Sequence, residues 1–264
     1  MSVTTVDEVI DQLGQIIDEA RRAGDRTGFF AALYRQVTIE VRDGIAAGVF
    51  DDGPRMQRLD VTFATRYLDA LDRFRHGGHA SGCWLLSFQA AVTRQPLILQ
   101  HLLLGINAHI NLDLGIAAAQ TAPGPQLPEL QGDFNRINDI LAGMIAQTRT
   151  DVEEVSPWIR LLDRVDPQAE DELIRFSLDR ARANAWSVAT RLSHLDPAQW
   201  PQEIDVLDGW ATVLGNLVLH PPGLAYNAAL AAIRARESND VAKVIDVLCQ
   251  PGGGGGAGSL RRTA

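Results

Sequence analysis

The sequence is short of the residues and motifs that several common protein classes require. It has 2 cysteines, Cys83 and Cys249, which lie far apart and belong to no CxxC or Cys-His pattern. A disulfide framework and a structural zinc site of the usual spacing are therefore not expected. A Walker loop and a Gly-x-Ser-x-Gly nucleophile elbow are missing as well. No standard phosphate-binding or hydrolase motif can be assigned.

Basic residues are outnumbered by acidic ones. The chain has 24 Lys and Arg against 33 Asp and Glu, which gives a formal net charge of -9 and an acidic pI. Binding to nucleic acid needs a basic face, and binding to anionic lipid needs a basic segment. The charge balance therefore argues against nucleic acid and against a membrane surface as the main partner.

Targeting and membrane signals are also scarce. Residues 1–8 lack the basic and apolar regions of a secretory signal. The most apolar stretch, Leu97–Ala119, is interrupted by polar residues, so we do not expect it to span a membrane. These interruptions are Gln100, His101, Asn107, His109, Asn111 and Asp113. The sequence predicts a soluble, cytoplasmic protein.

Apolar residues recur with the period of an amphipathic helix along most of the chain, whereas alternating strand patterns with tight turns are missing. We therefore predict an all-α fold, a single-domain helical bundle over residues 1–250. Its centre is a buried helix at about residues 97–120, because Leu, Ile and Ala occupy every side of this helix. The glycine-rich residues 251–264 are predicted to be a disordered tail.

The polar residues of the central helix fall on two sides. At 100° per residue, His101, His109 and Asp113 lie within one arc of about 120°. His109 and Asp113 are i,i+4 neighbours, so their side chains can meet. Asn107 and Asn111 form a second such pair on the opposite side, which favours contacts between helices. Two glycines of this helix, at positions 105 and 115, lower its helix propensity, which is tolerable if another backbone or a ligand comes close there.

The first arc suggests an enzyme that acts on a small, partly apolar substrate. His101, His109 and Asp113 are the candidate catalytic residues. Together with Glu40 and Asp60 they are also candidate ligands for zinc or iron, in a metal-dependent hydrolase or oxygenase. A metal-free alternative makes His109 a general base oriented by Asp113. In the other alternative, these residues are structural and the protein is a helical binding or scaffold protein. The sequence leaves these readings and the oligomeric state open.

Several supporting residues have two interpretations. Asp60 and Asp133 each precede an apolar periodic run, so each is either a helix N-cap or a carboxylate of a site, and the cap is favoured for Asp60. Glu40 either points into the core or reaches water, which is slightly favoured. Arginines are candidates to neutralise buried acids, and aromatic residues to wall an apolar pocket. The residues concerned are Arg66, Arg180, Arg182, Tyr67, Trp84 and Trp186.

Five segments resemble a bacterial domain-of-unknown-function family found mostly in high-GC organisms. They are Leu59–Tyr67, Cys83-Trp84, Gln100–Gly115, Asp133–Asn138 and Ala181–Trp186. The resemblance covers about residues 5–250 and leaves the glycine tail outside. It implies an all-helical fold unit, and it supplies no activity and no catalytic residues.

Overall fold

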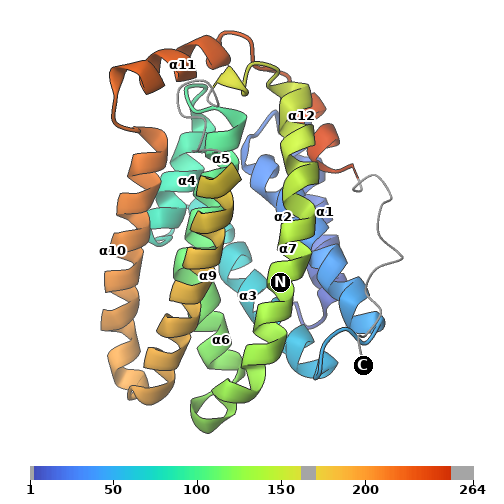
Figure 1. Cartoon of the computed structure of the whole chain (residues 1–264), viewed down its shortest axis with the longest axis vertical. Helices are drawn as coiled ribbons and strands as arrows, with labels where there is room; N and C mark the ends of the chain where they lie inside the picture. Colours follow the sequence, from blue (N-terminus) through green and yellow to red (C-terminus); the bar gives the residue numbers. More distant parts are fainter. Residues whose placement is uncertain (1–2, 162–170, 251–264) are drawn as a thin grey trace.

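The computed structural model describes residues 3–161 and 171–250 (Figure 1). Within these ranges the chain is helical and contains no strand, so the all-α prediction is confirmed. The predicted disordered tail, 251–264, lies outside the described residues. The α-helices are α1 (Val6–Ala23), α2 (Thr27–Ala46), α3 (Gly53–Arg75), α4 (Gly82–Val92), α5 (Ile98–Asn107), α6 (Gly115–Thr121), α7 (Leu127–Val155), α9 (Asp171–His194), α10 (Trp200–Leu219), α11 (Leu224–Arg234) and α12 (Val241–Leu248).

Local capping sets several helix ends. The side chain of Thr5 accepts a hydrogen bond from the backbone N–H of Glu8, and the Glu8 carboxylate accepts one from the backbone of Thr5, which is a capping box at the start of α1. Gly24 ends that helix with a left-handed φ of 67°. Asp52 caps α3 by accepting from the backbone of Arg55 at 2.8 Å.

The observed starts of α3 and α7 correct two interpretations of the sequence. Asp60 and Asp133 are not N-caps, because α3 begins at Gly53 and α7 begins at Leu127, so both aspartates lie inside helices. The first two turns of α3 already bury Met56 and Leu59, so the apolar period of this helix begins before Asp60. Pro54 and Pro128, each in a first turn, mark the true starts.

The predicted central helix is confirmed as one continuous helical segment, Ile98–Thr121. It consists of α5, a π-helix at Ala108–Leu114 and α6, and it packs against α2, α3, α4, α9 and α10 (Figure 1). Among the described residues, only this segment is long and apolar enough to cross a membrane. The protein itself buries 78% of its most apolar window, so it is the core helix of the bundle.

The asparagine side of this helix faces α10 and makes the contacts between helices that were predicted for it. Asn107 Nδ2 donates to the carbonyl of Ala211 at 2.7 Å, and Asn111 Nδ2 donates to Asn107 Oδ1 at 2.9 Å. Two turns earlier, Gln100 Nε2 donates to the carbonyl of Val218 at 2.7 Å. The asparagine side therefore joins the central helix to α10.

The central glycines allow close approach. A Cβ at Gly105 would collide with the ring of Phe30 in α2. A Cβ at Gly115 would lie 2.6 Å from the carbonyl oxygen of Ala185 in α9. Both helices can pack this closely only because these positions carry no side chain.

Candidate functional site

Asp113 is the centre of a buried polar cluster on the π-helix. It is 1% exposed and receives two hydrogen bonds, from Arg66 Nε to Oδ1 at 2.7 Å and from Trp84 Nε1 to Oδ2 at 2.8 Å. Arg66 comes from α3 and Trp84 from α4, so three helices converge on one carboxylate. His109 Nδ1 lies 3.7 Å from Asp113 Oδ2, which is too long for a hydrogen bond. The cation that compensates Asp113 is therefore Arg66.

Aromatic rings enclose the imidazole of His109. The ring of Phe63 stacks on it with centroids 3.5 Å apart, and the ring of Tyr34 meets it edge-on at 4.4 Å. Phe30 lies at 5.6 Å, also edge-on. Burial lowers the pKa of His109, and this effect outweighs the opposing influence of Asp113. His109 is therefore a neutral imidazole at pH 7.

The cluster is unusual in how many buried polar atoms lack a partner. Seven side-chain atoms on the central helix and its aromatic surroundings form no hydrogen bond within the described part of the chain. They are Tyr34 Oη, Asp60 Oδ2, Tyr67 Oη and both ring nitrogens of His101 and of His109. Each buried polar atom left without a partner costs about 1–3 kcal/mol. Natural proteins rarely leave such atoms unpaired, so their concentration here calls for an explanation.

Asp60 lies one turn before Phe63 on α3 and is 7% exposed. Burial raises the pKa of its carboxyl group to about 7. Burial also raises the pKa of the Tyr34 hydroxyl, with smaller contributions from the charges of Asp60 and Asp113. Tyr34 therefore lies within electrostatic reach of both acids, and it connects Asp60 to the cluster around His109.

His101 occupies a separate environment. Eight residues of helix place its Cα about 12 Å from that of His109, and its ring meets Phe29 edge-on at 5.8 Å. Burial lowers the pKa of His101 to about 3. Together with Phe30 and Trp84, His101 lines a small, partly open cavity of about 10 Å³, enough for one water molecule. Because Phe30 and Trp84 also surround His109, this cavity lies beside the cluster.

The five candidate metal ligands do not come together. Glu40 is exposed on α2, and His101 lies apart from the pair His109 and Asp113. No group of three or more His, Cys, Asp or Glu side chains placed to hold a metal is found in residues 3–161 and 171–250. Sharing one arc of a helix does not bring His101 to Asp113, because three turns of helix separate them along the axis.

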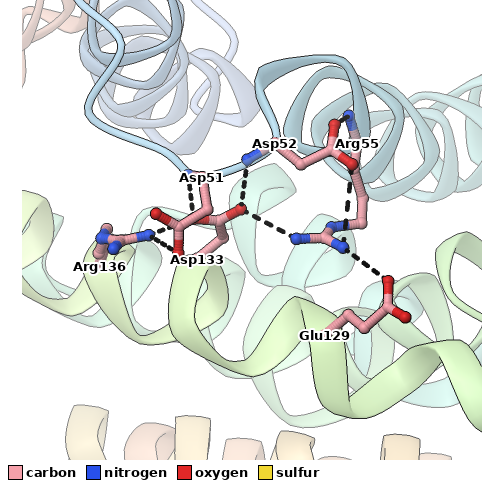
Figure 2. A network of polar contacts seen from close by, with 6 residues as sticks. All are labelled: Asp51, Asp52, Arg55, Glu129, Asp133 and Arg136. Atoms are coloured by element: carbon pink, nitrogen blue, oxygen red, sulfur yellow. Dashed lines mark hydrogen bonds and ion pairs between the residues drawn. The ribbon is translucent and has the colours of Figure 1, made fainter.

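Asp133 is another buried aspartate, and unlike Asp60 it is surrounded by hydrogen-bond donors (Figure 2). Asp133 is fully buried on α7 and accepts from the backbone N–H groups of Asp51 and Asp52 at 2.7 and 3.0 Å. Arg55 and Arg136 approach its carboxylate at 3.2 and 2.5 Å. Burial raises the pKa of Asp133, but the hydrogen bonds from both backbone groups and both arginines outweigh it, so the pKa is lowered. Every acceptor is used, and the network ties the loop before α3 to α7.

The remaining supporting residues are mostly structural. Arg182 of α9 donates to the carbonyl of Phe134 at 2.6 Å and to Asn138, which joins α9 to α7. Trp186 packs on Phe134 with ring centroids 5.0 Å apart, and Arg180 is exposed. Of the three arginines considered from the sequence, Arg66 is the one that neutralises a buried acid of the central helix.

Comparison with known proteins gives one match. The model of a family of unknown function, DUF5995, matches residues 6–221, which include the central helix and every residue of the His109 cluster. Searches of curated proteins and of solved structures give no match.

Proposed function

The chain belongs to DUF5995, a family of unknown function, and we propose that it binds a small, partly apolar molecule at the cluster around His109. The neutral imidazole then accepts a hydrogen bond or a proton from that molecule. The observation that supports this proposal is the set of buried polar atoms without partners around His109, namely Tyr34 Oη, Asp60 Oδ2, Tyr67 Oη and both ring nitrogens of His109. A bound molecule with an apolar body and a few polar groups would satisfy them.

The arrangement of Asp113 suits His109 for proton transfer. Arg66 and Trp84 hold the carboxylate in place, and its Oδ2 is 3.7 Å from His109 Nδ1. A shift of well under 1 Å would make a hydrogen bond there. That bond would keep the proton on Nδ1, leave Nε2 free to accept one, and stabilise the imidazolium that results.

The π-helix supports a functional reading of the same region. His109 and Asp113 both lie within Ala108–Leu114. π-Helical turns are rare and occur often at functional sites. The adjoining cavity of about 10 Å³ is far smaller than an ordinary ligand site. Binding therefore requires the aromatic side chains between His101 and His109 to move.

A structural role is the second candidate, and one observation favours it. The imidazole of His109 stacks on Phe63 at 3.5 Å and meets Tyr34 at 4.4 Å, which is how a core aromatic residue packs. In this alternative the protein is a scaffold whose buried polar groups set the register of the central helix.

Side-chain NMR separates the two candidates. In ¹⁵N-labelled protein, phenol and benzamide serve as probes because each joins an apolar ring to a polar group. The ring-nitrogen signals of His109 are assigned by their loss in His109→Gln. We expect these signals to shift saturably at millimolar probe, both in the wild type and in the control His79→Gln, whose histidine is exposed. Failure of both probes to shift these signals counts against the proposal.

The stability of a His109 variant distinguishes the two candidate functions independently. Replacing His109 by Leu removes two buried nitrogens that have no partner. If His109 is kept for function, this replacement should not lower the free energy of unfolding. The scaffold role predicts instead a loss above about 1 kcal/mol. Urea unfolding followed by circular dichroism measures the difference.

A further inference from the structure

An open cleft of about 460 Å³ carries a concentration of positive charge on an otherwise acidic protein. It lies where the end of α1 and the starts of α2 and α12 meet, beside the connection from α4 to α5. The arginines that line it are Arg21, Arg22, Arg26 and Arg94.

Two of these arginines have no partner in the part of the chain that the structure describes. Arg26 and Arg94 form neither an ion pair nor a side-chain hydrogen bond with any residue in the described ranges. Burial, followed by the charge of Arg94, lowers the pKa of Arg26, so the two guanidinium groups lie close enough to repel each other. Arg21, by contrast, pairs with Asp246 at 2.9 Å. A pair of unpaired cations facing the same cleft is stabilised when an anion lies between them.

The nearby carboxylates are already engaged. Asp25 accepts from the backbone N–H and the hydroxyl of Thr27 at 2.9 and 2.8 Å. Glu237 pairs with Arg234 at 2.7 Å and accepts from the backbone of Ile98 at 3.1 Å. Neither forms an ion pair with Arg26, although the charges of both reach it.

The start of α12 forms a further wall of the cleft. Val241 and Ala242 line it, and the first-turn N–H groups of a helix have no acceptor within that helix. Asp240 also lines the cleft, but its carboxylate accepts from the backbone N–H of Lys243 at 3.1 Å as the N-cap. The wall therefore offers N–H donors together with one acidic group.

We propose that this cleft binds a small anion through phosphate or carboxylate oxygens held between Arg26 and Arg94. The guanidinium groups would supply charge-assisted hydrogen bonds, and the start of α12 would supply backbone donors. Arg26 also lines the small cavity beside His101, so the anion would sit next to that cavity. Anion binding here does not require any chemistry at His109.

Isothermal titration calorimetry on the full chain tests the cleft, with pyrophosphate and succinate as probes at constant ionic strength. Arg26→Gln and Arg94→Gln are each expected to weaken binding at least about tenfold. The matched control Arg58→Gln removes an exposed arginine of α3 and should change nothing. Asp240→Asn keeps a good N-cap while removing the acidic charge, so it should tighten binding severalfold.

The probes also identify the ligand chemistry, because tighter binding of pyrophosphate indicates phosphate oxygens and tighter binding of succinate indicates carboxylates. Absence of saturable binding of either probe overturns the proposal. An equal loss in Arg58→Gln does so too, since it would show a response to net charge alone. Failure of Asp240→Asn to tighten binding would place the anion elsewhere. Circular dichroism confirms that each variant is folded.

Discussion

Asp60 should make the protein less stable as the pH rises. Its carboxyl group is buried, Oδ2 has no partner within the described ranges, and its pKa is raised to about 7 by burial alone. An aspartate in the unfolded chain has a pKa of about 3.9. Between these two values the folded state binds more protons than the unfolded state. The free energy of unfolding therefore falls as the pH rises through this window, and the contribution of the protonated acid is lost above about pH 7.

The size of the effect follows from the shift. A rise of about three pKa units, at 1.36 kcal/mol per unit, corresponds to about 4 kcal/mol at most. Asp60→Asn removes the ionisation and keeps the shape. The variant should match the wild type near about pH 4 and exceed its stability by up to about 4 kcal/mol near about pH 8.

Urea unfolding followed by circular dichroism, repeated across this pH range on both proteins, gives the difference directly. Other titrating groups cancel in the comparison because they are common to both. A stability difference that does not change with pH would refute the reasoning, and so would a variant less stable than the wild type at about pH 8. The first result would mean that Asp60 is ionised in the folded protein over this range, and the second that it is also paired there.

Three further predictions use the same measurement. Asp133→Asn should lose about 3 kcal/mol at neutral pH, and the loss should shrink as the pH falls and the wild-type carboxylate, whose pKa is lowered, becomes protonated. His101→Leu should flatten the loss of stability that the wild type shows as the pH falls from about 6.5 toward 3, because only the unfolded chain protonates His101 there. Gly105→Ala should destabilise by at least about 1 kcal/mol through its clash with Phe30, whereas Gly209→Ala, in open space on α10, should stabilise by about 0.5–1 kcal/mol. The first two predictions fail if the free energy of unfolding of the variant depends on pH as that of the wild type does. The third fails if both glycine substitutions change the free energy of unfolding in the same direction.

Local patterns were enough to predict the central helix and much of its packing. Asn107 and Asn111 pair with each other as i,i+4 neighbours, and the side they occupy faces α10. At Gly105 and Gly115 the sequence left open whether a neighbouring backbone or a ligand comes close, and the structure places Phe30 and Ala185 there. These features depend on helix geometry, which a spacing in the sequence reports directly.

The partners of Asp113 were only partly predictable. Arg66 is 47 residues away and Trp84 is 29 residues away, and periodicity alone does not say which arginine reaches which acid. The i,i+4 spacing correctly placed His109 beside Asp113, yet it suggested a hydrogen bond where the distance is 3.7 Å. The π-helix left no signal in the apolar pattern.

The sequence by itself determined an all-α chain with one buried polar helix, because composition and a period of 3.6 residues are local properties. Only the tertiary structure decided what the polar groups do. Asp60 and Asp133 are both buried acids inside helices, and only the presence of arginines and backbone donors around Asp133 distinguishes them. In the same way, folding alone brought Arg26 and Arg94 to one cleft. Burial and electrostatic partners depend on residues that are distant in the chain, so the pKa and the role of each group emerge only when the helices pack.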